Sequence, residues 1–307
     1  MVFCCLFGLR HEGHKGGIPM KKRWKILLLG TVCLFAMAGC GASESGEIIT
    51  EDTAAEYVEK AQDMLEEANG FAADFCAEVQ VAGAGGTKTE GSVTLAKEPL
   101  FMHVDTTLSF DKLKQEYDLY LEKTEDAVNQ YMSYDGEWTE MTMDEASALA
   151  GAQIYNTLYN METILTAAEN WSAEKTGNDI VLTGSIPEAK FYDVESYTRW
   201  FQLAGMSGLA EVYYVGVGDV PVEVFLDGRT GAPKGYAVSL EQALETMTNN
   251  VLTELGGGSL REPVEVETYS IVSELTQLGD VEAGEIPAEA KNDAINYEKE
   301  YSSMDKQ

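Results

Sequence analysis

The sequence predicts a protein of the α+β class, in which amphipathic helices pack on an antiparallel sheet. Two patterns carry this prediction. Consecutive segments with alternating apolar residues are joined by short turns, which is typical of strands in a meander. Other segments repeat their apolar residues every three or four positions, as a helix with one apolar face does. With 307 residues, 45% of them hydrophobic, the chain is long enough to bury a substantial core.

The N-terminal part has the features of an export signal. A basic cluster at residues 21–25 precedes a largely apolar stretch at 26–38, which is too short for a comfortable membrane span. We therefore interpret residues 20–39 as a signal peptide. Because a signal normally opens the chain and Met20 stands directly before the basic cluster, residues 1–19 are predicted to be an upstream extension.

The signal ends in Met37-Ala38-Gly39-Cys40, which resembles the lipobox of bacterial lipoproteins. That resemblance implies that the signal is cut before Cys40 and that the Cys40 thiol carries a diacylglycerol. Two or more acyl chains give a stable anchor, so the predicted location is extracytoplasmic, on the cell membrane. The alternative is a plain secretory signal followed by an incidental cysteine.

The segments that follow alternate between a tether, a helix and a meander. Residues 40–51 are small, polar and acidic, which predicts a flexible tether. A capped apolar stripe predicts a helix over 53–69. Alternating apolar residues then predict strands, separated by glycine-rich, Pro99 and Asp135-Gly136 turns. The predicted strands of this meander are 71–81, 91–96, 100–110, 116–122, 129–134 and 137–139.

The second half mixes helices with strands. An apolar stripe predicts one helix over 144–170, with a kink at Gly151, and the same period predicts helices at 192–203 and 241–255. The predicted strands are 179–185, 209–217, 220–226, 236–240 and 264–275. Asp227-Gly228 opens a hairpin loop. We assign residues 52–286 to one domain and the polar residues 287–307 to a C-terminal tail, in which 299–307 are expected to fray.

The charge of the chain argues against nucleic-acid binding. Acidic residues outnumber basic ones by 52 to 21, which gives a net charge of −31 and argues against nucleic-acid binding. Residues 1–39 hold six basic residues and one acid, so their removal shifts the charge to −36. Such a chain stays soluble and is repelled by an anionic membrane surface.

No motif for catalysis, a metal or a cofactor stands out. Ser172 and Lys175 match a Ser-x-x-Lys pattern, but the pattern recurs elsewhere in the chain and its usual companion motifs are missing. After removal of the signal only His103 remains as a histidine, which excludes the common zinc sites. We interpret His103 as a half-buried structural residue and expect neither enzyme activity, nor a metal, nor a cofactor.

The order of signal, tether, helix and interrupted meander resembles bacterial lipoproteins of the LolA/LolB and LppX-like fold, and most closely a group of Gram-positive lipoproteins. The motifs that carry the resemblance are Cys40, the 53–69 helix, the 71–96 hairpin, Tyr134–Trp138 and Leu226–Gly231. The resemblance implies a curved antiparallel half-barrel sheet with amphipathic helices packed on its concave face. It also implies a cavity that holds acyl chains.

Aromatic and apolar residues of the middle segments are the candidate ligand site. Ordinary core packing explains them. The alternative is an apolar pocket between sheet and helices, for which we expect a lipid-like or other apolar small molecule. The residues are Tyr155, Tyr159, Met161, Trp171, Trp200, Phe201, Tyr213 and Tyr214. A second hypothesis is an accessory envelope protein that binds another protein through its sheet edge or acidic surface.

Overall fold

The computed structural model describes residues 47–49, 51–110, 112–206, 208–258 and 262–296. The predicted extension (1–19), signal peptide (20–39), lipidation residue Cys40 and residues 299–307 lie outside the described part.

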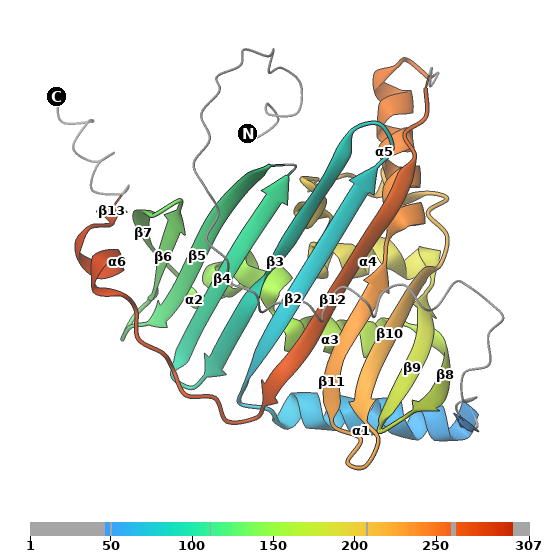
Figure 1. The fold of residues 1–307 in the computed structure, drawn as a ribbon, viewed down its shortest axis with the longest axis horizontal. Coiled ribbons are helices and arrows are strands. Elements are labelled where there is room, and N and C mark those ends of the chain that lie inside the picture. The colour runs from blue at the N-terminus through green and yellow to red at the C-terminus, as the bar shows by residue number, and fades with distance from the viewer. Residues whose placement is uncertain (1–46, 50, 111, 207, 259–261, 297–307) are drawn as a thin grey trace, which may run out of the picture. The chain divides into compact units, whose positions relative to one another are not determined.

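One open sheet of thirteen strands forms the framework (Figure 1). In chain order the strands are β1 (Glu47–Ile49), β2 (Gly70–Val81), β3 (Gly85–Lys97), β4 (Leu100–Phe110), β5 (Leu113–Lys123), β6 (Val128–Tyr134), β7 (Glu137–Met143), β8 (Glu169–Thr176), β9 (Asp179–Ile186), β10 (Val220–Asp227), β11 (Pro233–Ser239), β12 (Val266–Leu278) and β13 (Ile295–Asn296). Their order across the sheet is β1-β8-β9-β10-β11-β12-β2-β3-β4-β5-β6-β7-β13. Neighbours run antiparallel, except that β13 is parallel to β7.

The helices lie between and after the strands. They are α1 (Glu51–Glu67), α2 (Glu145–Ala152), α3 (Thr157–Ala167), α4 (Glu188–Thr198), α5 (Glu241–Leu255) and α6 (Ala288–Asn292), with the short 3-10 helices η1 (Gln153–Tyr155), η2 (Trp200–Ala204) and η3 (Glu211–Tyr214). Helices α2 to α4 lie behind the strands in Figure 1, and α1 crosses the lower ends of β9 to β11.

The two faces of the sheet carry different cores. On β4, Met102 and Val104 join the main core, in which α1 to α5 pack on one face of the sheet. The alternate residue Phe101 belongs to a second, small core on the opposite face, where Ile286 and Ala290 cover it. Period-two alternation along the strand explains this division. The predicted fold class, α+β with an open antiparallel sheet on which helices pack, is confirmed, with the short helix α6 on the face opposite to the other helices.

Buried hydrogen bonds attach α3 to the sheet. The Thr157 and Ser273 hydroxyls lie 2.9 Å apart, and the Asn160 amide donates to the Tyr236 hydroxyl at 3.3 Å and to the Ile154 carbonyl at 3.2 Å. These polar side chains are buried and so require partners inside the protein.

Three predicted segments need correction. The predicted helix 144–170 is divided into α2, η1 and α3, because the Asn156 side chain caps α3 by accepting from the Tyr159 amide. Its last residues form β8. The predicted helix 192–203 begins earlier and is interrupted at Arg199, which has a positive φ of 56°.

The third correction concerns residues 209–217, which were predicted as a strand. They contain η3 instead, flanked by Gly208 and Gly216 with φ angles of 65° and 82°. The Tyr214 ring is drawn into the core, where it lies 6.0 Å from Phe201 and 6.1 Å from Phe191. Tertiary packing has overridden the strand propensity of this segment.

Candidate functional site

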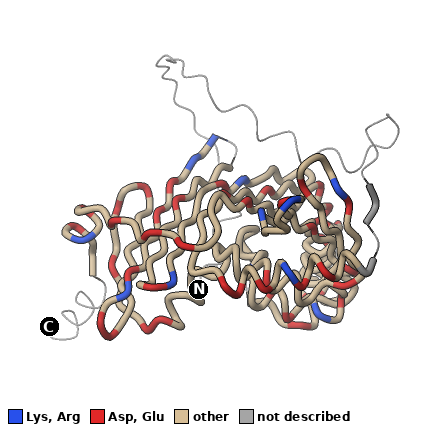
Figure 2. The backbone as a smooth tube through the Cα atoms, turned by 90° about the horizontal axis from the view of Figure 1, so that it is seen from below, with Lys and Arg blue, Asp and Glu red and all other residues tan. Residues whose placement is uncertain are grey.

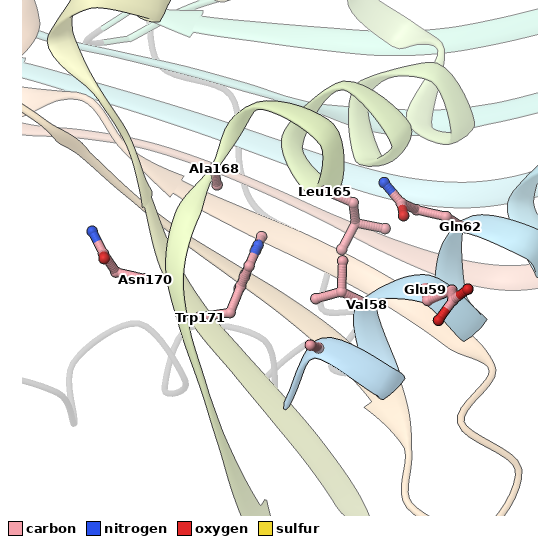
Figure 3. Close-up of a pocket in the computed structure, with 8 residues that line it drawn as sticks. Val58, Glu59, Gln62, Leu165, Ala168, Asn170 and Trp171 are labelled. Atoms are coloured by element: carbon pink, nitrogen blue, oxygen red, sulfur yellow. The ribbon is translucent and has the colours of Figure 1, made fainter. Parts of the chain in front are cut away.

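A groove of about 380 Å³ lies between α1, the end of α3 and the start of β8 (Figure 3). Its lining residues are Ala55, Val58, Glu59, Gln62, Leu165, Ala168, Asn170 and Trp171. Val58 and Leu165 point toward one another in Figure 3, and the Trp171 ring stands beside them. The groove therefore has an apolar floor with polar side chains at its rim.

Helix packing builds one wall of the groove. Ala54, Ala61 and Leu65 of α1 are buried in the main core, which leaves Val58 and Gln62 half-buried on the flank of the helix. The Gln62 amide donates to the Thr166 hydroxyl at 3.4 Å and so links α1 to α3. The repeat of apolar residues at three and four positions explains why one flank faces the core and the next faces the groove.

A β-bulge places Trp171 in the groove. Glu169 pairs with Ser185 and Ser172 pairs with Thr183, so two residues of β8 oppose Gly184 alone. One of these two, Asn170, has a positive φ of 58°. Bulges of this kind bend a strand and redirect a side chain.

Gly184 makes room for the redirected ring. A Cβ atom at this position would lie 2.8 Å and 2.9 Å from ring carbons of Trp171. The indole can lie against the β9 backbone only because glycine has no side chain.

The lining of the groove is suited to a neutral, apolar ligand. Its only charged side chain is Glu59, and Gln62 and Asn170 add amide groups. Pockets for small molecules combine an apolar lining with a few polar groups in this way. An anionic ligand would have to keep its charge away from Glu59.

The structure does not gather the eight predicted ligand residues into one pocket. Four of them are buried in the main core, namely Met161, Trp200, Phe201 and Tyr214. The Phe201 ring lies 5.8 Å from Phe191 and 6.0 Å from Tyr214, which are ordinary packing distances between ring centroids. Tyr155 packs on Phe75 at 5.4 Å between ring centroids. Tyr213 lies near Glu254, whose carboxylate raises the pKa of the Tyr213 hydroxyl. Trp171 lies in the groove, and Tyr159 lines a second hollow.

Glu195 is the most deeply buried carboxylate of this aromatic region. Its side chain is 7% exposed and accepts from the Tyr214 hydroxyl at 2.9 Å and from the Phe201 amide at 3.2 Å. Burial raises the pKa of the Glu195 carboxyl, and the two hydrogen bonds act in the opposite direction. Both oxygens have partners, so the group belongs to the core.

The remaining reactive candidates have structural surroundings. His103 stacks on Tyr120, with 4.1 Å between ring centroids, and lies 3.5 Å from Asp118. Ser172 and Lys175 are three positions apart on β8 and so lie on opposite faces of the strand. Within the described residues, no group of three or more His, Cys, Asp or Glu side chains could hold a metal ion.

Sequence reasoning found Trp171 but missed its neighbours in the groove. Val58 and Leu165 were assigned only to the apolar faces of their helices. The groove depends on contact between α1 and α3, which lie about a hundred residues apart in the sequence, and no local pattern reports such a contact.

Comparisons with known proteins add a likeness of fold. No protein-family model and no curated protein matches the chain. The crystal structure of the Mycobacterium tuberculosis lipoprotein LppX is similar, with 12% identity, a TM-score of 0.40, and coverage of 76% of this chain and 100% of LppX. LprF from Mycobacterium bovis has 9% identity and a TM-score of 0.41, over 78% of this chain and 98% of LprF.

Of the described helices, none has the length and apolar character that crossing a membrane requires. The predicted anchor residue, Cys40, lies outside the described part.

Proposed function

We propose that the protein is an extracytoplasmic lipoprotein, anchored through a lipid on Cys40, that binds an apolar chain in the groove of Val58, Leu165 and Trp171. The observation that carries the ligand proposal is the bulge that turns Trp171 over Gly184 into an apolar hollow. The signal, the small residues and Cys40 in sequence support the anchor. Helix α1 begins eleven positions after Cys40, so the groove lies on the part of the domain closest along the chain to the membrane.

The size of the groove favours a single chain. A volume of about 380 Å³ falls within the range of small-molecule sites, about 300–1,000 Å³. The groove is open to solvent, so it can cover part of one chain laid against Val58, Leu165 and Trp171. This space suits one acyl chain and leaves the remainder of a lipid outside.

We infer binding without catalysis. The groove lining offers one carboxylate, Glu59, and the amides of Gln62 and Asn170, and it contains no cysteine, serine, histidine or lysine. A nucleophile paired with a base is therefore missing from this lining.

Binding is tested with cis-parinaric acid, a fluorescent fatty acid, on the full chain carrying Cys40→Ser, so that the protein's own lipid does not compete. We expect saturable binding that Trp171→Ala weakens by about tenfold, equivalent to about 1.4 kcal/mol. The matched control is Trp138→Ala, because Trp138 packs on the opposite face of the sheet. Equal binding by the wild type and Trp171→Ala would refute the ligand proposal, provided that circular dichroism shows both folded.

The anchor is tested in cells by labelling with a palmitate analogue and by detergent-phase partition. We expect label and membrane partition for the wild type and neither for Cys40→Ser. Cys76→Ser is the matched control, since it removes the other cysteine of the mature chain. Loss of label in both variants, or in neither, contradicts the proposal.

Docking of an envelope protein is a second candidate function. Val212, Val215 and Leu255, on or next to η3 and α5, are 64%, 67% and 78% exposed, which is unusual for aliphatic side chains. A photo-crosslinking residue at position 255 should then capture one dominant partner in living cells, whereas the same residue at position 113 should not. Diffuse products from both positions would contradict it.

A further inference from the structure

The groove beside Trp171 lies where the described chain begins. Strand β1 runs antiparallel to β8, and its first residue, Glu47, is opposite Lys175. Trp171, which lines the groove, stands four positions before Lys175 on the same strand. Helix α1 begins at Glu51, and its first turns form the other wall of the groove (Figure 3). The first two described elements of the chain therefore lie beside the groove or form it.

The length of the preceding chain places Cys40 within reach of this groove. At about 3.3 Å for each position of a strand, the four positions from Lys175 to Trp171 span about 13 Å. Seven positions separate Cys40 from Glu47, and a flexible chain of that length has a root-mean-square end-to-end distance of about 13–16 Å. The two lengths match. A match of this kind gives a tethered group its highest effective concentration, which is about millimolar for a short linker.

The groove offers an acyl chain on Cys40 an apolar surface outside the membrane. Its floor is formed by Val58, Leu165 and Trp171, and each methylene group that a chain removes from water there favours binding. A bilayer covers the acyl chains of an anchor along their whole length, whereas the open groove covers part of one. The acyl chain therefore prefers the bilayer to the groove, and the groove to water.

We propose that an acyl chain of the protein's own lipid occupies the groove while the protein is away from a bilayer, and that insertion of this lipid into a membrane frees the groove for other apolar ligands. This inference rests on the proposed function, because it requires both the lipid on Cys40 and the groove. Away from a membrane, a foreign ligand has to compete with a tethered chain at high effective concentration. The membrane thus regulates access to the groove.

The test attaches a brominated dodecyl chain to Cys40 of the mature chain, residues 40–307, carrying Cys76→Ser so that Cys40 supplies the only thiol. Bromine quenches tryptophan fluorescence on close contact. We expect the label to remove at least about half of the emission of Trp171, because the tether keeps the chain at about millimolar effective concentration. Comparison with Trp171→Phe isolates that emission. Vesicles of neutral phosphatidylcholine should restore it, because they take up the attached chain.

The matched control attaches the same brominated chain elsewhere. Leu113→Cys, in a protein that also carries Cys40→Ser and Cys76→Ser, places the chain at the start of β5. Eight strand spacings of about 4.8 Å separate β5 from β8 in the sheet. This label should leave the emission of Trp171 unchanged.

Three results would overturn the proposal. They are emission of Trp171 that the label on Cys40 leaves unchanged in water, quenching that persists after vesicles are added, and quenching that disappears on dilution, since the last would mean that the chain enters the groove of a second molecule. Circular dichroism shows whether the labelled protein is folded. If parinaric acid binds the Cys40→Ser chain but the attached chain does not quench Trp171, the proposed groove stands and its occupation by the protein's own lipid does not.

Discussion

At the scale of single residues, Gly184 determines where Trp171 can lie. We expect Gly184→Ala to force the indole away from β9 and to lower the free energy of unfolding by about 1–3 kcal/mol, since the core has no room for the added methyl group. Urea denaturation measures this change. The same variant should weaken parinaric acid binding, because the ring leaves the groove.

The control for this prediction is the same substitution at a site without neighbours. A Cβ atom at Gly151 in α2 would meet no atom within 4 Å. Gly151→Ala should therefore stabilise the protein by about 0.5–1 kcal/mol, because alanine is the better helix former. Destabilisation of equal size at both glycines would contradict the steric explanation.

Glu195 gives a prediction about pH at the same scale. Because burial raises the pKa of its carboxyl above that of the unfolded chain, the folded state binds the proton more tightly. The contribution of Glu195 to stability therefore increases as the pH falls from neutral through the raised pKa, and levels off below the ordinary value of about 4.3.

Glu195→Gln isolates this contribution from that of the other carboxylates. We expect the free energy of unfolding of the variant, minus that of the wild type, to decrease as the pH is lowered from about 7.5 to about 4.5. Chemical denaturation at a series of pH values measures it. A difference that is constant with pH would show that the carboxyl is protonated alike in both states, and one that increases on acidification would show that folding lowers its pKa; either result would contradict the prediction.

At the scale of elements, the sequence predicted the regular strands and helices well and the irregular ones badly. The strand at 100–110 and the helix at 241–255 have the predicted bounds, because turn and glycine signals mark their ends. The prediction of a strand at 209–217 was wrong. Its Val and Tyr residues favour a strand locally, whereas contacts with distant rings hold Tyr214 in the core. The groove beside Trp171 could not be predicted either, because it depends on contacts between α1, α3 and β8 that form only in the folded chain.

The attachment of α3 to the sheet gives a prediction at this scale. Asn160→Ala removes the donor to the Tyr236 hydroxyl and the Ile154 carbonyl, and leaves both buried without that partner. We expect a loss of about 1–3 kcal/mol in urea denaturation. Gln62→Ala is the control, since its single exposed hydrogen bond should contribute less than about 0.5 kcal/mol. If Asn160→Ala and Gln62→Ala lowered the free energy of unfolding equally, burial of the hydrogen bond would not determine the size of the loss.

At the scale of the whole molecule, charge is the dominant feature. Acidic positions greatly outnumber basic ones along the backbone in Figure 2, and the net charge is −31. Repulsion within so acidic a chain opposes the compact state. Five lysine–carboxylate ion pairs in the described residues, most of them well exposed, offset little of this repulsion.

Salt should therefore stabilise the protein. We expect the urea midpoint to rise between about 10 mM and 150 mM NaCl, over which the screening length falls from about 30 Å to about 8 Å. Urea is the denaturant of choice because it carries no charge. A midpoint that falls with salt would mean that attractive pairs outweigh the general repulsion.

The two outermost strands have a further consequence. A sheet of thirteen strands ends in β1 with three residues and β13 with two, so neither edge presents a long row of free backbone groups. Long exposed edges invite the addition of strands from other molecules, and short edges are a common protection. Proteins confined to a membrane plane meet copies of themselves far more often than proteins free in solution. For a lipid-anchored chain, such short edge strands would keep neighbouring molecules from pairing their sheets into a continuous fibril.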